Sequence, residues 1–203
     1  MSEWQYGSAP RDLGLIDVCS PEMKYYLYLP VMLPGSDLKV PRRLGSLKPL
    51  LDRVIETEET RGKHVYVTAK TMFVSQGCSG NRPGWHADGY RSGGDINFIW
   101  YDMNPTEFAV HPFFDIPEDD SESMKAFESQ AICTATFPAK HLLRLDESVI
   151  HRTSPLTTPG VRTFVKITVS EHRFARLGNS HNYELDYDWK LTDRSNERNI
   201  DHG

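Results

Sequence analysis

Three residues of this sequence have the types and spacing of a metal-binding set. His86 and Asp88 are two positions apart in the segment Pro83 to Gly89, which lies between two stretches expected to be strands. Side chains at i and i+2 of an extended chain point the same way, so both can bind one ion from one side. A third candidate, His151, ends the short run from Ser148. Two histidines and one carboxylate on one face of an octahedral ion suit ferrous iron and leave three positions for small molecules.

A cation follows this set in the strongest strand pattern of the chain, Val161 to Ser170. There Arg162, Phe164 and Lys166 alternate with apolar residues. If the apolar face packs under helices, the two cations point into the interior, where an unpaired charge is costly. We therefore expect an anion inside, and the Arg162 guanidinium is suited to clamp a carboxylate bidentately. Each of these signals is short enough to occur by chance when taken alone. Their order along the chain is what supports the metal-binding interpretation.

The combination resembles the iron(II)- and 2-oxoglutarate-dependent oxygenases of double-stranded β-helix fold. The resemblance rests on Trp85-His86-Ala87-Asp88, on Val149-Ile150-His151-Arg152-Thr153-Ser154 and on Val161-Arg162-Thr163-Phe164, within about residues 64–170. It implies that His86, Asp88 and His151 hold Fe(II) and that Arg162 binds the far carboxylate of 2-oxoglutarate. It also implies use of O2, with decarboxylation of 2-oxoglutarate to succinate coupled to hydroxylation or demethylation of a substrate.

One position departs from the family pattern. Many members have Ser or Thr two residues after the arginine, to share the same carboxylate, and here that position is Phe164. The hydroxyl would then come from Thr168, Tyr66 or Tyr101, and the sequence does not choose between them.

The elements that must position these residues are mostly strands. Apolar and β-branched residues alternate in several short runs, and turn residues separate them. Ser46 is a good N-cap for a helix over about 46–56 with one apolar face, and a weaker helix is expected over about Pro117 to Gln130. We expect a single domain over 1–203: a mainly β double-stranded β-helix, or jelly roll, with its core at about 64–170, an N-terminal flank of helix and strand, and a C-terminal arm. The remaining expected strands are 25–33, 64–74, 96–101, 107–114, 131–137, and 142–145 joined in a hairpin to 148–151.

Composition excludes several classes of protein. The 203 residues include four Trp, nine Tyr and nine Phe, which is enough to build a core. The longest apolar stretch, Tyr25 to Leu33, is too short to span a membrane. The net charge of −5 does not call for a polyanionic partner. Three cysteines without Cys-x-x-Cys spacing, and no visible signal peptide, predict a cytoplasmic protein without disulfide-linked partners.

Five residues near the motif are candidates for substrate contact, and each also has a purely structural interpretation. The alternative is core packing for the two tryptophans, a solvated loop for Tyr90 and Arg91, and a surface ion pair for Arg152. These residues are Trp85, Tyr90, Arg91, Trp100 and Arg152. A basic cluster from Lys39 to Lys48 is interpreted as a solvated segment, with contacts to nucleic-acid phosphates as its alternative.

Two other classes of function fit the same residues. One is a cupin-like or jelly-roll binding module without turnover, and the other is a zinc or manganese hydrolase or isomerase with the same triad. The sequence leaves the substrate open among small molecules, amino-acid side chains and nucleobases, because pocket walls come from loops. Oligomeric state is also left open.

Overall fold

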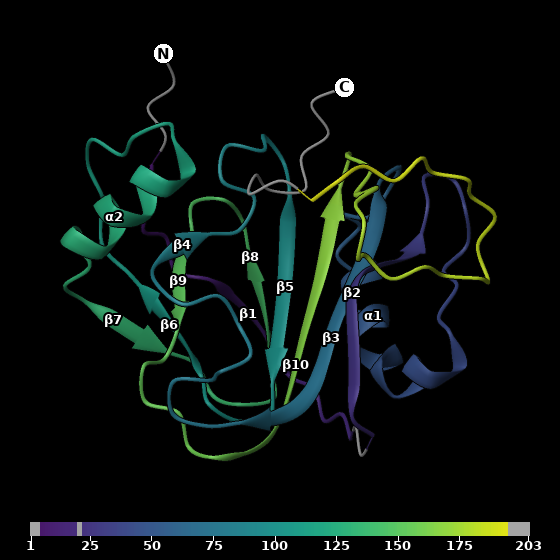
Figure 1. The fold of residues 1–203 in the computed structure, drawn as a ribbon, viewed down its shortest axis with the longest axis horizontal. Helices are drawn as coiled ribbons and strands as arrows, with labels where there is room; N and C mark the ends of the chain where they lie inside the picture. Colours follow the sequence, from purple (N-terminus) through teal and green to yellow (C-terminus); the bar gives the residue numbers. More distant parts are fainter. Residues whose placement is uncertain (1–4, 20–21, 195–203) are drawn as a thin grey trace.

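A computed structural model describes residues 5–19 and 22–194 (Figure 1). Within these ranges the chain forms ten strands, two α-helices and a 3₁₀ helix over Arg42–Leu47, which confirms the mainly β composition. The helices are α1 (Lys48–Ile55) and α2 (Asp120–Gln130). The strands are β1 (Arg11–Leu15), β2 (Lys24–Met32), β3 (His64–Val74), β4 (His86–Ala87), β5 (Ile96–Tyr101), β6 (Thr106–Ala109), β7 (Thr134–Thr136), β8 (His141–Leu145), β9 (Ile150–Thr153) and β10 (Gly160–Ser170).

These strands form two antiparallel sheets that face each other. The larger sheet has the order β1-β8-β5-β10-β3-β2, and the smaller has the order β4-β9-β6-β7. From β3 to β10, successive strands change sheet at every connection except the one between β6 and β7. Figure 1 shows α1 on the outer side of the larger sheet and α2 on the outer side of the smaller one. The chain therefore encloses an interior between two sheets whose strands it visits alternately.

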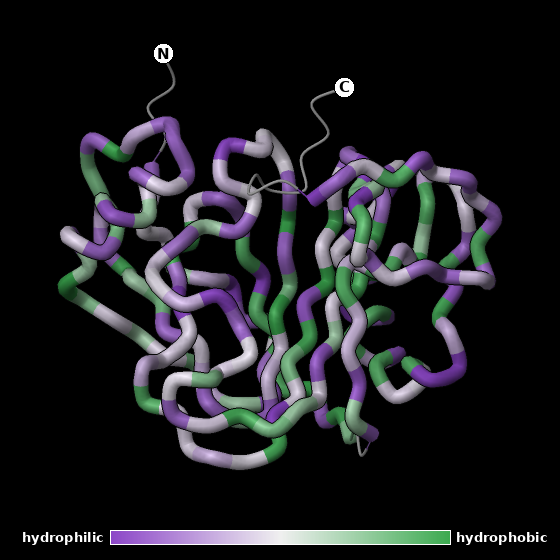
Figure 2. The backbone as a smooth tube through the Cα atoms, viewed as in Figure 1, coloured by the Kyte–Doolittle hydropathy of each residue, from purple (hydrophilic) through white to green (hydrophobic). Residues whose placement is uncertain are grey.

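The central strand β10 has one apolar and one polar face, as its sequence predicts. Its apolar side chains pack with those of β3 and with Leu50, Leu51 and Val54 of α1. The opposite face turns toward the smaller sheet and carries Lys166 and Thr168. Figure 2 shows the resulting alternation of hydropathy along β5 and β10. Burial of the apolar face thus fixes which side chains of β10 reach the interior.

The two helices begin later than the sequence pattern suggests. Ser46 is not the cap of α1, because residues 42–47 form the 3₁₀ helix and α1 begins at Lys48, with Pro49 in its first turn. The N-cap of α2 is Asp119, whose side chain accepts a hydrogen bond from the Glu122 amide. Phe127 of α2 is buried against the outer face of the smaller sheet.

Two features of strand pairing differ from expectation. The predicted hairpin of 142–145 with 148–151 does not form, because β8 pairs with β1 and β5 while β9 pairs with β4 and β6. The turn at Asp146 instead carries the chain from one sheet to the other. Strand β1 is not predicted by its sequence; its pattern is mostly exposed and its pairing with β8 is long-range. The predicted strands 107–114 and 131–137 are shorter in the structure, where only β6 and β7 form within these segments.

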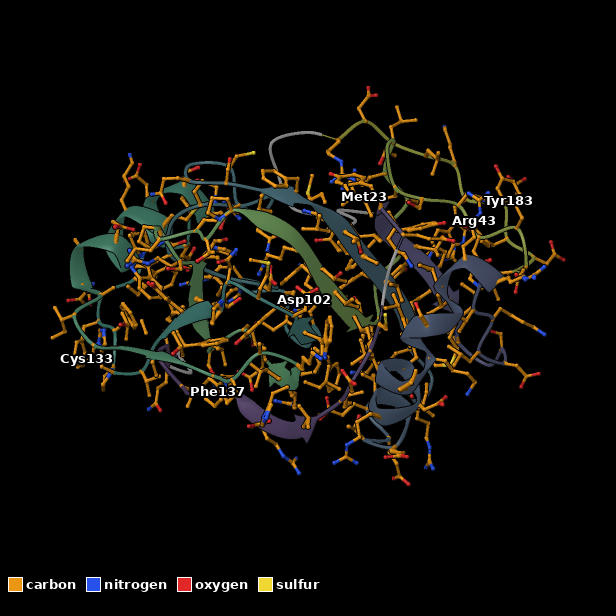
Figure 3. The ribbon with its side chains drawn as sticks, turned by 90° about the horizontal axis from the view of Figure 1, so that it is seen from below. Met23, Arg43, Asp102, Cys133, Phe137 and Tyr183 are labelled. Atoms are coloured by element: carbon orange, nitrogen blue, oxygen red, sulfur yellow. The ribbon has the colours of Figure 1, made fainter. Side chains whose placement is uncertain are left out.

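The C-terminal arm docks on the larger sheet. The buried Asn182 side-chain amide donates hydrogen bonds to the carbonyls of Pro30 and Lys39. Trp189 packs against the rings of His64 and Tyr66. Tyr183 is 91% exposed and projects from the outer edge of the arm (Figure 3). The predicted end of the arm lies outside the described residues.

The described part of the chain contains no helix long and apolar enough to cross a bilayer. The three cysteines are free and exposed, and Figure 3 shows Cys133 at the periphery, beside the smaller sheet.

Candidate metal centre

The fold brings the three predicted metal ligands together. One nitrogen from each of His86 and His151 and one oxygen from Asp88 all lie within 4.8 Å of one another. His86 of β4 is directly opposite His151 of β9 in the smaller sheet. Their neighbours Ala87 and Ile150 point outward into the core under α2, so both imidazoles point inward. Asp88 follows β4 directly, and its carboxylate oxygen Oδ2 lies 3.6 Å from Nε2 of His151.

Both imidazoles are oriented in the same way. Nδ1 of His86 lies 2.9 Å from the carbonyl oxygen of Gly84, and Nδ1 of His151 lies 3.2 Å from that of Val149. In each case the carbonyl belongs to the residue two positions earlier. A proton on Nδ1 then donates to the carbonyl and leaves the lone pair on Nε2 for a metal. Burial, with His151 beside it, lowers the pKa of His86 to about 3, so this imidazole is neutral at neutral pH, as a ligand must be.

Asp88 has a cationic partner from the opposite sheet. The Lys166 ammonium of β10 donates a hydrogen bond to Oδ2 of Asp88 at 3.1 Å and lies 3.4 Å from the hydroxyl of Tyr28. Burial raises the pKa of Asp88, but the Lys166 ammonium together with His151 and His86 outweighs burial and holds that pKa well below the ordinary value. Burial likewise lowers the pKa of Lys166, and Asp88 together with Tyr28 outweighs burial and raises it. The inward lysine thus has the anionic partner that the sequence required, and the partner is a candidate metal ligand.

The triad opens into a cavity of about 490 Å³ between the sheets. Lys70 of β3 lines it next to Lys166, and its ammonium donates to the carbonyl of Gly80 at 3.0 Å. Burial, with Lys166 nearby, lowers the pKa of Lys70. The cationic residues on the wall outnumber the acidic ones, since Arg82, Arg152 and Arg194 join the two lysines against Asp88, Asp95 and Asp120. The cavity therefore favours an anionic occupant, and a bound dication adds to that preference.

Arg162 is buried, as predicted, but it is not among the residues that line this cavity. Its guanidinium donates to the backbone carbonyls of Met103 at 2.9 Å and Asn104 at 3.3 Å. The ring of Phe164, which lines the cavity, lies 5.1 Å from the guanidinium carbon. Burial lowers the pKa of Arg162 to about 10. In this structure two backbone carbonyls accept hydrogen bonds from Nε and Nη2 of the arginine, and with its amide in the better-satisfied orientation the side-chain oxygen of Asn81 accepts one from Nη1 at 3.0 Å.

Of the three hydroxyls considered for the carboxylate, Thr168 alone lines the cavity, and it donates to the side-chain oxygen of Asn97 at 2.7 Å. Tyr66 and Tyr101 are buried elsewhere and donate to the backbone carbonyls of His172 and Phe137. Sequence reasoning missed Lys70 as a cavity residue, although its position between the alternating apolar residues of β3 places it on the inward face. It also missed Tyr28, whose position depends on a register shift between β2 and β3.

Three predicted substrate contacts belong to packed cores instead. Trp100 shares the outward face of β5 with Phe98, and its indole N–H donates to the carbonyls of Ile16 and Lys140. Trp85 and Tyr90 pack under α2, and the Tyr90 hydroxyl donates to the carbonyl of Pro117. Two-residue alternation decides the two tryptophans, since each indole is on the face of its segment opposite the cavity. Tyr90 lies in the turn that follows β4, where alternation does not apply.

The predicted arginines have separate placements. Arg152 lines the cavity, with Nε donating to Glu107 at 2.8 Å and its guanidinium stacked 4.4 Å from the ring centre of Trp85. Arg91 forms an ion pair with Glu118 at 2.7 Å and is not among the lining residues. In the basic cluster of 39–48, Lys48 pairs with Asp52 on the exposed face of α1, which fits a solvated segment.

The chain matches no protein-family model, no curated protein and no solved structure in the comparisons made. The metal assignment therefore depends on the donor set itself. Two neutral imidazoles oriented by backbone carbonyls and one ionised carboxylate, all facing a cavity, fit a divalent transition metal.

Proposed function

We propose that this chain is an Fe(II)- and 2-oxoglutarate-dependent oxygenase with a jelly-roll core. The observation that carries the proposal is the inward-facing set of His86, Asp88 and His151 at the wall of a cation-rich cavity. When bound, Fe(II), 2-oxoglutarate and O2 supply the oxidising chemistry, in which 2-oxoglutarate yields succinate and CO2 while a substrate is hydroxylated or demethylated. The chain's own residues hold the metal, orient the anion and exclude bulk water.

The strand order supports the proposed fold. In a double-stranded β-helix, eight antiparallel strands alternate between two facing sheets and the ligands come from strands of the smaller sheet. Strands β3 to β10 are eight in number among the described residues, they alternate between sheets apart from β6 and β7, and both histidines belong to the smaller sheet. The first of these strands begins at His64 and the last ends at Ser170, which is about the range over which the sequence resembles the family.

Two cations are candidates for the far carboxylate of 2-oxoglutarate. Arg162 remains the prediction from the sequence, and Lys70 is the alternative that the cavity offers. Lys70 is directly opposite Phe164 in the β3–β10 ladder, one inward position along from Lys166. The Arg162 guanidinium lies against the ring of Phe164, which lines the cavity, whereas Lys70 is itself on the cavity wall.

The test is an anaerobic titration of the metal-free protein with Fe(II) and then 2-oxoglutarate, followed by the visible metal-to-ligand charge-transfer band. We expect a band in the wild type and none in Asp88→Ala. Asp120→Ala is the matched control, because Asp120 also lines the cavity but contacts Arg82 rather than the triad. Comparison of Lys70→Met with Arg162→Met then identifies the carboxylate anchor as the variant that needs more 2-oxoglutarate to develop the band.

Other outcomes select the rival functions. Iron binding without a band on adding 2-oxoglutarate contradicts the oxygenase proposal and favours a hydrolase or isomerase that uses zinc or manganese. If the protein binds no divalent metal, a jelly-roll binding module is the remaining interpretation. In that case the two histidines are polar residues that hydrogen-bond backbone carbonyls, and Asp88 is one that pairs with Lys166.

A further inference from the structure

We infer that Lys166 makes metal binding at this site depend on a carboxylate anion. In the metal-free protein the Lys166 ammonium binds Asp88. Metal binding displaces it, and a carboxylate ligand beside the metal becomes its new partner. This inference rests on the proposed metal centre and goes beyond it, because it assigns Lys166 as a positioning residue that couples two ligands.

The first step of the argument is which oxygen Lys166 binds. The ammonium is 3.1 Å from Oδ2 of Asp88, and the same oxygen is 3.6 Å from Nε2 of His151. This is the carboxylate oxygen that faces the histidine ligand. A metal that joins Asp88 to His151 therefore approaches the oxygen at which the lysine already donates.

The second step is what happens to the lysine when a metal arrives. Asp88 is the counter-charge of the buried ammonium, and the other polar contact of that ammonium among the described residues is the Tyr28 hydroxyl at 3.4 Å. A dication on Asp88 takes up that negative charge and repels the ammonium. Lys166 is then a buried cation without a counter-charge, which is unfavourable. Metal binding alone is weakened by this effect.

The third step is the class of ligand that removes the penalty. A carboxylate that binds both the metal and the cavity wall brings one negative charge between the metal and Lys166. Lys70 on the neighbouring strand adds a second positive charge, its ammonium bonded to the neutral Gly80 carbonyl rather than to an acid. An α-keto acid or a dicarboxylate fits this pair of cations, whereas a neutral ligand leaves Lys166 uncompensated. Metal and anion thus strengthen each other's binding, and the coupling is reciprocal.

The experiment measures the affinity for Mn²⁺, which is stable in air, by calorimetry without and with saturating 2-oxoglutarate or oxalate. In the wild type we expect either anion to raise the Mn²⁺ affinity by about 5- to 150-fold, the usual range of such coupling. In Lys166→Met we expect tighter Mn²⁺ binding without anion and a much smaller gain on adding it. The anion experiment on the wild type stands by itself if the variant does not fold.

Lys70→Met is the matched control for the variant. It removes a cation from the same cavity wall but no hydrogen bond to Asp88. A direct role for Lys166 predicts that the Mn²⁺ affinity without anion rises more in Lys166→Met than in Lys70→Met. An equal rise of the Mn²⁺ affinity in the two variants would mean that the total positive charge of the cavity weakens metal binding. That result would overturn the inference that Lys166 exchanges Asp88 for a carboxylate ligand.

The remaining outcomes separate this inference from the proposed function. If Mn²⁺ binds the wild type equally well with and without anion, the coupling is wrong while the metal centre stands. If Mn²⁺ does not bind the wild type even with anion, the metal centre itself is wrong and the inference falls with it. His151→Ala measures the background of adventitious binding in both arms.

Discussion

The ion pair of Lys166 and Asp88 joins the two sheets of the molecule across its interior. Lys166 belongs to β10 of the larger sheet, and Asp88 follows β4 of the smaller one. Their side chains are 13% and 21% exposed, so solvent screens the contact only weakly. The pair therefore stabilises the metal-free structure and occupies a ligand of the candidate metal centre at the same time.

Removal of one partner from this pair should be costly. Lys166→Met leaves the Asp88 carboxylate buried without its cation, and we expect a loss of about 3–5 kcal/mol in the free energy of unfolding of the metal-free protein. The double variant Lys166→Met/Asp88→Asn removes both charges and should recover much of that loss. Urea denaturation in the presence of a chelator measures both quantities. A double variant no more stable than Lys166→Met would show that the pair contributes little.

The neutral His86 predicts how stability depends on pH without metal. Its pKa in the folded protein is about 3, below the ordinary value of 6.5, so the unfolded state binds the extra proton. The stabilisation is present above pH 6.5 and is lost as the pH falls toward 3, by about 1.4 kcal/mol for each pH unit. Denaturation of the metal-free protein between pH 6 and pH 4 checks this, and His86→Gln should reduce the slope. A residual slope is expected from His64, whose pKa burial also lowers. An unchanged slope in His86→Gln would contradict the buried neutral imidazole.

The residue after Asp88 must be glycine for two reasons. Gly89 has φ of +69°, and a Cβ there would lie 2.9 Å from Cβ of Asp95 and 2.9 Å from Oγ of Ser92. We expect Gly89→Ala to cost at least about 1–3 kcal/mol and to weaken metal binding, because the strain adjoins a ligand. Gly93→Ala is the control, since Gly93 has φ of +76° but open space around it. Equal effects of the two substitutions on metal affinity would remove the steric part of the argument.

Substitution of Trp100 should lower the stability of the fold and leave ligand affinity unchanged. Trp100→Phe removes the N–H that bonds the carbonyls of Ile16 and Lys140, at a cost of about 1–3 kcal/mol. The affinity of the folded variant for Mn²⁺ should equal that of the wild type. Thermal unfolding and calorimetry measure the two effects, and a selective loss of ligand binding would restore the prediction that Trp100 contacts a substrate.

Much of the candidate centre was predictable because strand geometry is local. The spacing of His86 and Asp88 places both on one side of an extended segment, and the alternation of residues 161–170 is enough to identify Lys166 as inward-facing. The order of the motifs along the chain nominated His151 as the third ligand, but its position opposite His86 comes from the long-range pairing of β4 with β9. The hairpin at Asp146 was predicted wrongly, because a turn signal shows that the chain reverses but not whether it returns to the same sheet.

The sequence by itself determined the mainly β character, the apolar face of β10 and the pairing of His86 with Asp88, since each follows from residue type and a period of two; His151 was nominated by the order of the motifs. Only the tertiary structure decided that Asp88 is the anion beside Lys166, that Arg162 donates to backbone carbonyls, and that Trp100 faces away from the cavity. These are contacts between residues 40 or more positions apart in the chain. They depend on how the two sheets face each other, and local periodicity carries no information about that.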